Sequence, residues 1–526
     1  MSSFSIRPQM FAVTARCFLY VVVVCWCVIG NNLRSADAQG AKSKAAKALP
    51  NLESEHRETH RRFAESLEKL AQTCEKRDLA ATAIQIRRIA QPVDPNLLRF
   101  EPLPREVQQP IPNDLVGDEL AWRTQLREHR QLYAEKLDVL AHKAVKAGLP
   151  TYAYQLTREV AHHDPDHTRA RRLLGFVRYK DEWVSLFEAD KLKRGEVWTD
   201  RWGWLKEAHV SRYQNGERLS LNGRWVSAEK DAELRRDFSK AWEIRTEHYL
   251  LKTNESLERG VELATSLEDF HRFFQQTFAA FFNDSTQMQK LFENPAVVGR
   301  TAAKPFVIHF FSTRDEYIEV LIGKYNQQIK ITNGLYDTDK GIVYTFNNPG
   351  MAAETTLFHE ATHQILAAHL KLGPVIARNQ NFWLIEGVAC YIESFQRTKE
   401  RLTLGDPRYE RFVVARYRLL NDGYYLPLAQ FTAMGKDPFQ LSPQIQNNYS
   451  QASGLVHFFM HYERGLYRDD LIEHLRQIYQ QAERPGAIVE SLEDLAGVSF
   501  ADLDRQYAEY VRAMSKVLGE NFAPQP

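Results

Sequence analysis

The chain has 526 residues, of which 44 per cent are hydrophobic and 26 per cent charged, and this length and composition indicate a folded protein of two or three domains. Its 68 lysine and arginine residues are nearly balanced by 67 aspartate and glutamate residues, so the net charge is only +1. Because there is no basic excess to bind a phosphate backbone, nucleic acid is excluded as an expected partner.

Residues 1–38 have the features of a signal peptide. Arg7 and Arg16 precede the apolar stretch CFLYVVVVCWCVIG, which is too short to span a bilayer comfortably, and Ala36-Asp37-Ala38 matches an A-x-A cleavage signal. We expect cleavage after Ala38, export to the periplasm or the extracellular space, and no stable membrane anchor in the mature chain. An uncleaved anchor is the alternative.

Cleavage at this position leaves only two of the five cysteines, Cys74 and Cys390. Export permits disulfides, but the two residues are far apart in sequence, so we expect two buried free thiols.

Residues 39–115 are expected to contain three segments. Residues 39–50 are rich in Ala and Lys and predict a flexible leader, and apolar residues at near-helical spacing from about 51 to 95 predict a helical hairpin. Pro92, Pro102, Pro104, Pro110 and Pro112 then predict a proline-rich link.

Residues 116–179 predict further helices, with breaks at Gly148-Leu149-Pro150 and at Asp164-Pro165. Small and large apolar residues alternate as in one or two tetratricopeptide-like helix pairs, although no clean 34-residue period is present. The N-terminal helices are therefore either a packing domain or a surface for a protein partner.

Residues 180–239 contain Trp183, Trp198, Trp202, Trp204 and Trp225 among short strands and turns. Tryptophan clusters occur in carbohydrate-binding platforms, but such large rings more often fill a core, so we predict a small Trp-rich β module.

Residues 240–520 combine strands and helices. Strands are predicted at 246–253, 305–311 and 341–346, with helices between and after them; the helices after residue 393 are predicted at 408–421, 449–464, 468–482 and 500–516. The fold class expected for the whole chain is therefore α+β, mostly helical, with a small mixed β-sheet.

The sequence His359-Glu360-Ala361-Thr362-His363 stands at the centre of this region. Side chains four residues apart share one face of a helix, so His359 and His363 can bind one metal ion, with Glu360 beside them as a general base. Catalytic zinc sites use three protein ligands and leave the fourth position to water. From Asn348-Pro349 to Gly373-Pro374, the flanking residues predict the required helix.

The third ligand is expected to be Glu386, which lies 23 positions after His363 (386 − 363) in the run FWLIEG. His369 competes for this role because the longer pattern HExxHxxGxxH places a histidine there. That pattern needs a glycine to turn the chain, and the corresponding residue is Leu366, a good helix former. On a continuous helix, His369 would lie roughly 240° around from His363.

The segment WLIEGVACYIE, from Trp383 to Glu393, resembles the WLNEG-x-x-x-Y-x-E segment of the gluzincin metallopeptidases, especially the zinc aminopeptidases. This resemblance implies that His359, His363 and Glu386 bind zinc and that Glu360 activates water. It also implies an oxyanion-stabilising role for Tyr449 in NNYSQASG, a peptide or protein substrate, and substrate binding along a strand edge, for which 341–346 is the candidate.

The stretch before His359 lacks the Gly-x-Met-Glu-Asn run with which the aminopeptidases anchor a free amino terminus. The resemblance therefore implies an endopeptidase rather than an aminopeptidase. The chain is also similar to secreted bacterial proteins that combine a HEATHQ helix, a W-x-x-E-G segment and a helical N-terminal region.

The function expected is zinc-dependent hydrolysis of peptide bonds. Two alternatives are a helical binding or scaffold protein with a relic zinc site, and a zinc amidase that acts on cell-wall peptides. His457 and His461 also have i, i+4 spacing but no adjoining glutamate, so we interpret them as packing or solvent-facing residues.

Overall fold

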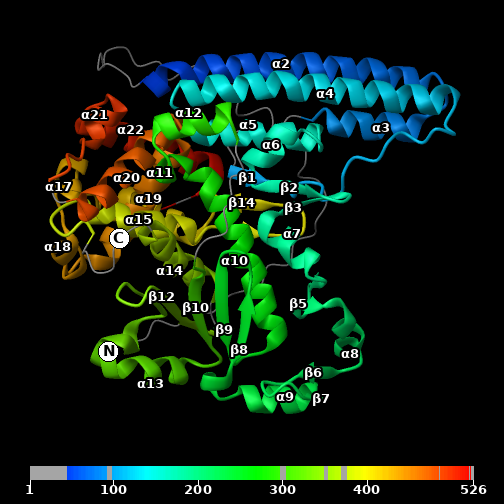
Figure 1. The fold of residues 1–526 in the computed structure, drawn as a ribbon. Coiled ribbons are helices and arrows are strands. Elements are labelled where there is room, and N and C mark those ends of the chain that lie inside the picture. Colours follow the sequence, from blue (N-terminus) through cyan, green and yellow to red (C-terminus); the bar gives the residue numbers. More distant parts are fainter. Residues whose placement is uncertain are drawn as a thin grey trace. The chain divides into compact units, whose positions relative to one another are not determined.

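The computed structural model describes residues 44–91, 98–295, 304–348, 353–368, 376–484, 486–520 and 522. The predicted signal peptide and the beginning of the predicted leader lie outside these residues. Within them the chain is a mostly helical α+β protein with small β-sheets, as the sequence predicts (Figure 1).

The N-terminal region is a group of helices with its own apolar core. Its members are α2 (Lys44–Glu75), α3 (Ala80–Ile89), α4 (Gly117–Lys146), α5 (Pro150–His163) and α6 (Thr168–Leu173). The two long helices α2 and α4 run side by side (Figure 1). The predicted flexible leader is wrong from Lys44 onward, because Ala45 and Leu49 are buried in this core and the helix extends over Pro50.

The predicted proline-rich link takes part in a sheet. It contains β1 (Leu98–Phe100), which pairs antiparallel with β14 (Leu402–Leu404), and β14 pairs in turn with β13 (Gln396–Arg397). Leu98 and Phe100 are buried, and the ring of Phe100 lies 4.2 Å from that of Phe273. The segment therefore joins the N-terminal helices to the C-terminal region through backbone pairing rather than as a free linker.

The tryptophan-rich region consists of three β-hairpins in tandem, each followed by a helix. They are β2 (Phe176–Tyr179), β3 (Glu182–Ser185) and α7 (Leu186–Lys193); β4 (Glu196–Thr199), β5 (Gly203–Lys206), η1 (Glu207–His209) and α8 (Val210–Gln214); and β6 (Glu217–Leu219), β7 (Trp225–Ser227) and α9 (Ala228–Arg235). Trp183, Trp204 and Trp225 occupy the same hairpin position at intervals of 21 residues (204 − 183 and 225 − 204). Three separate two-stranded sheets thus replace the single module expected.

A five-stranded mixed sheet begins the C-terminal region. Its strands are β8 (Trp242–Arg245), β9 (Tyr249–Thr253), β10 (Phe306–Phe311), β11 (Gly334–Asp337) and β12 (Ile342–Phe346), in the order β11-β12-β10-β9-β8. The three predicted strands correspond to β9, β10 and β12, which run parallel to one another, whereas β8 and β11 are antiparallel edge strands that the sequence did not predict.

Helices surround this sheet and continue to the end of the chain. The short η2 (Phe238–Lys240) precedes the first strand, and between the strands lie α10 (Leu257–Thr277), α11 (Ala279–Phe282), α12 (Ser285–Glu293), α13 (Arg314–Tyr325) and η3 (Asn326–Ile331). After it follow α14 (Ala353–Ala367), α15 (Phe382–Ile392), α16 (Glu410–Leu420), α17 (Leu428–Thr432), α18 (Lys436–Gln440), α19 (Ile445–His461), η4 (Tyr462–Arg464), α20 (Arg468–Glu483), α21 (Leu492–Ala496) and α22 (Phe500–Leu518). The four helices predicted after residue 393 correspond to α16, α19, α20 and α22.

One large apolar core extends through the sheet and the C-terminal helices, with α15 and α19 packed closely at its centre. All eleven residues of α15 are buried, including Glu386. A carboxylate in this position needs a cationic or hydrogen-bonding partner, because burial of an unpaired charge is costly.

Both cysteines of the described region are free and buried, as predicted. None of its helices is long and apolar enough to cross a membrane.

Candidate metal centre

The two histidines of the HEATH motif lie on one face of α14. The opposite face of this helix is apolar: Leu357, Ala361 and Ile365 are fully buried in the large core. The Gln364 side chain donates hydrogen bonds to the carbonyl oxygens of Val307 and Gly341, at 3.0 and 2.8 Å, which fixes α14 against the sheet. Leu366 is part of α14, so this helix continues through the position where a glycine turn would be required for His369 to bind.

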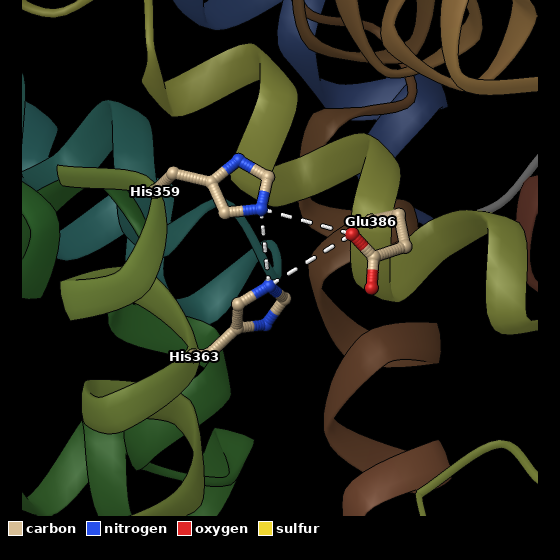
Figure 2. A group of neighbouring side chains, drawn as sticks. All are labelled: His359, His363 and Glu386. Carbon is tan, nitrogen blue, oxygen red and sulfur yellow. Dashed lines mark hydrogen bonds and ion pairs between the residues drawn. The ribbon is translucent and has the colours of Figure 1, made fainter. Parts of the chain in front are cut away.

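Three side chains converge from α14 and α15 (Figure 2). The Nε2 atoms of His359 and His363 are 3.3 Å apart, and Oε2 of Glu386 lies 3.7 Å from the first and 3.9 Å from the second. Zinc binds nitrogen and oxygen at about 2.0 to 2.2 Å in a tetrahedron, so its ligand atoms stand about 3.4 Å apart. The donor atoms and their spacing fit a zinc ion with three protein ligands.

The protonation states suit ligand roles for Glu386 and His363. Burial alone would raise the pKa of Glu386, but the hydrogen bond from His359 and the charge of His363 lower it to about 2. Burial lowers the pKa of His363 to about 4. A carboxylate and a neutral imidazole are therefore the forms expected near neutral pH, and both can donate lone pairs to a metal.

The imidazole of His359 is oriented by Glu393. Its Nδ1 lies 2.8 Å from Oε1 of Glu393, and Arg411 donates two hydrogen bonds to the same carboxylate, from Nε at 2.7 Å and from Nη2 at 2.8 Å. The Tyr409 hydroxyl donates a further bond at 3.2 Å. With a metal bound, a carboxylate facing Nδ1 would hold the proton there and leave the Nε2 lone pair for the metal.

We expect Glu393→Gln to lower zinc affinity by about 10- to 100-fold, because an outer carboxylate fixes the tautomer and raises the basicity of its histidine. The affinity is measured by competition with a chromophoric chelator. Glu400→Gln, in the exposed turn between β13 and β14, is the matched control and should bind zinc as the parent does. Unchanged affinity in Glu393→Gln would show that His359 needs no support from this residue.

Glu360 lies beside the ligands and is partly buried. Burial raises the pKa of Glu360 to about 7. The charge of His359 acts against this rise, and the charge of Glu386 adds to it. It also accepts a hydrogen bond from the backbone N–H of Tyr336 in β11. A carboxyl group with a pKa near neutrality, next to a metal-ligand set, is suited to accept and return a proton.

Strand β11 passes directly over α14. A Cβ atom at Gly334 would come within 2.6 Å of the Thr356 side chain and 3.1 Å of that of Glu360, so only glycine allows this approach. Because β11 ends the sheet, its outer edge faces Glu360 through the Tyr336 N–H. The expectation that 341–346 forms the free edge is therefore wrong: β12 is paired on both sides, with β10 and β11.

Tyr449 in α19 also reaches the site. Its hydroxyl hydrogen-bonds the carboxylate of Glu386, and Gln440 at the end of α18 hydrogen-bonds Tyr449. Burial raises the pKa of Tyr449, so the hydroxyl stays protonated and can donate. The Tyr449 hydroxyl therefore contacts a candidate metal ligand directly.

The structure brings together His359, Glu360, His363, Glu386 and Tyr449, all singled out from the sequence. His369 lies outside the described residues. His457 and His461 do not join this cluster: His457 is buried against α16 and α22, with its Nε2 3.2 Å from the Gly405 carbonyl oxygen and Nδ1 2.9 Å from the Tyr510 hydroxyl oxygen.

A role for Glu393 was not predicted from the sequence. Glu393 follows Glu386 by seven residues, about two helical turns, and caps α15, so its side chain continues the face that carries Glu386; this spacing was the available signal. Arg411 had no such signal, because it comes from α16, beyond the β13–β14 hairpin.

Part of the chain is similar to a described protein family. A family described as Protein of unknown function (DUF1570) matches residues 353–483, which are 131 of the 526 residues (483 − 353 + 1). No curated protein matches the chain. The matched segment begins with α14 and ends with α20, so it contains the five site residues predicted from the sequence together with Glu393 and Arg411.

Proposed function

We propose that the chain is an exported zinc metallopeptidase that hydrolyses peptide bonds. The observation that carries the proposal is the triangle of ligand atoms from His359, His363 and Glu386, with edges of 3.3 to 3.9 Å, beside the partly buried Glu360. Three ligands of this type leave one position open for chemistry. The resemblance of the Trp383–Glu393 segment to the gluzincins supports the same reaction.

In this proposal each side chain has one task. Zinc in such a site lowers the pKa of water to about 7 and polarises a carbonyl group. Glu360 accepts the proton of the attacking water and passes it to the leaving amine, for which a pKa of about 7 is well matched. Tyr449 donates a hydrogen bond to the oxyanion that develops on the scissile carbonyl.

The outer edge of β11 provides the place for an extended substrate. An edge strand presents unpaired N–H and C=O groups, and a peptide can add to it as a further strand. The Tyr336 N–H that bonds Glu360 lies on this edge. Gly334, two residues away, has its backbone groups on the same side because strands repeat every two residues. A peptide bound there would pass the metal ligands.

The targeting segment supports the cellular location. Arg7, Arg16, the apolar core and Ala36-Asp37-Ala38 have the order of a cleavable signal. The mature chain would therefore act in the periplasm or outside the cell, on peptides or proteins, or on cell-wall peptides if it is an amidase.

The test is digestion of an unbiased peptide library and of purified cell-wall fragments by the purified mature protein. We expect cleavage with one equivalent of zinc, loss of cleavage after treatment with a chelator, and recovery when zinc is restored. Products identified by mass spectrometry distinguish cleavage within peptides from release of cell-wall amides. Absence of any cleavage by the fully zinc-loaded protein would refute the proposal.

A further inference from the structure

A pocket of about 330 Å³ lies between the first half of α4 and the segment 108–112 that precedes this helix. The helix contributes Trp122, Arg123, Leu126, Arg127 and Arg130, which share one face because they are spaced by about one helical turn. The segment 108–112 forms the opposite wall. The residues that line the pocket come from none of the elements that carry the candidate metal ligands, so it is a separate place in the fold.

The wall formed by 108–112 is fixed at both ends of its contact with the N-terminal helices. The backbone N–H of Gln108 donates to Oδ1 of Asp166 at 3.3 Å, and Nη2 of Arg127 donates to the carbonyl oxygen of Gln109 at 2.8 Å. The two prolines of the segment restrict its backbone further, because their rings fix φ. The segment is therefore held beside α4, and the pocket is already formed in the chain without a ligand.

The pocket carries positive charge that the chain does not neutralise. No Asp or Glu lines it, and Arg127 and Arg130 form no ion pair with any residue that the structure describes. Nη2 of Arg130 donates to the carbonyl oxygen of His162 at 2.5 Å, but its Nε is buried without a hydrogen-bond partner among the described residues. Burial lowers the pKa of Arg130, and the charge of Asp164 offsets this only in part. An anion in the pocket would supply the missing counter-charge.

The rest of the lining is largely apolar, with Trp122, Leu126, Ile111 and the two prolines. Glu119 does not line the pocket, because its carboxylate accepts hydrogen bonds from Nε1 of Trp122 at 2.8 Å and from Nε of Arg123 at 2.7 Å. A guanidinium group binds a carboxylate through two parallel hydrogen bonds. A doubly charged phosphate would lose more hydration beside apolar side chains than a carboxylate does. The lining therefore favours one carboxylate attached to an apolar body.

We propose that this pocket binds a small apolar carboxylate through Arg127 and Arg130. The two guanidinium groups donate hydrogen bonds to the carboxylate, and the apolar body packs on Trp122 and Leu126. The volume is at the lower end of the range for ligand pockets, about 300 to 1,000 Å³, so the ligand is about as large as one acylated amino acid. The carboxylate belongs either to a free acid or to the C-terminal residue of a peptide. This inference goes beyond the proposed function and needs no zinc.

The experiment is isothermal titration calorimetry on the full mature chain, with zinc and after zinc is removed by chelation. The ligands are N-acetyl-phenylalanine, its amide, phenyl phosphate, and an acetylated pentapeptide that ends in phenylalanine. We expect the acid to bind at least about tenfold more tightly than the amide, the effect of one charged hydrogen bond, and more tightly than phenyl phosphate. A peptide that binds the zinc-free chain as the acid does identifies peptide ends as the source. A peptide that does not bind identifies free acids.

Four variants test the residues themselves. Arg127→Gln and Arg130→Gln should each weaken binding of the acid about tenfold, and Arg127→Lys should retain part of the affinity because the charge is kept. Lys136→Gln, at an exposed lysine of α4 outside the pocket, is the matched control and should bind as the parent does. Thermal unfolding followed by circular dichroism checks that each variant is folded.

Three results would overturn the inference. The first is equal binding of the acid and the amide, or no binding of either at millimolar concentration. The second is a preference for the acid that persists in both Arg127→Gln and Arg130→Gln. The third is binding that disappears when zinc is removed, because it would place the carboxylate on the metal centre instead. The peptidase proposal is tested separately by cleavage, so either idea can fail without the other.

Discussion

The Glu360→Gln variant should lose peptide hydrolysis by about a thousandfold in kcat while binding zinc as the parent does. Glutamine keeps the size of the side chain and an acceptor for the Tyr336 N–H, but it cannot take a proton from water, and general base catalysis contributes about 10² to 10⁴ in rate. The measurement is kcat on the best library peptide, beside zinc content by elemental analysis.

Glu354→Gln is the control on the same helix, because Glu354 is bonded to Arg259 and Ser266 away from the metal ligands. It should retain the activity of the parent.

The Tyr449→Phe variant should lower kcat by about a hundredfold and leave KM nearly unchanged, because it removes one oxyanion donor. Full activity in Glu360→Gln would assign the base to another residue, and full activity in Tyr449→Phe would leave that hydroxyl with a supporting role only.

Removal of a metal ligand should have an equally large effect on zinc content. We expect about one zinc per chain in the parent and less than about 0.1 in His363→Ala and in Glu386→Ala, because two remaining ligands hold zinc far more weakly than three. The parent should also unfold at a lower temperature after chelation, since zinc stabilises the state that binds it. Both quantities are measured on dialysed protein, with circular dichroism as the check on folding.

Two histidine variants complete this measurement. His369→Ala tests the competing ligand and should keep its zinc, and His129→Ala, on α4 in the N-terminal helices, is the control for the loss of any histidine. Loss of zinc in His369→Ala but not in Glu386→Ala would show that His369, not Glu386, is the third ligand. The site would then have three histidine ligands.

His359 and His363 could be predicted as candidate metal ligands from the sequence because their placement depends on local geometry. His359 and His363 are one helical turn apart, and Leu366 favours continuation of the helix rather than a turn toward the metal. The buried strands β9, β10 and β12 could likewise be predicted, because each is a run of apolar residues. In each case the information lies within about ten residues of the position concerned.

The features that were missed depend on distant parts of the chain. β11 is four residues long, and nothing in GLYD shows that it would cover β12 and take the edge position. Arg411 meets Glu393 only after a hairpin reverses the chain. The 21-residue repeat of Trp183, Trp204 and Trp225 is visible in the sequence, but its hairpins pair only within themselves, so alternation over three or four residues gave a weak signal.

The pairing of β1 with β14 has a consequence for how the chain reaches its native state. Phe100 meets Leu402, which is synthesised 302 residues later (402 − 100). The N-terminal core likewise includes Ala279, Met288 and Phe292 from α11 and α12. Such long-range contacts slow folding, because the conformational entropy of a large loop is lost before burial of the paired residues compensates for it. The N-terminal helices are therefore expected to complete their packing only after most of the polypeptide has been made, and refolding should proceed as one slow step shared by both ends of the chain.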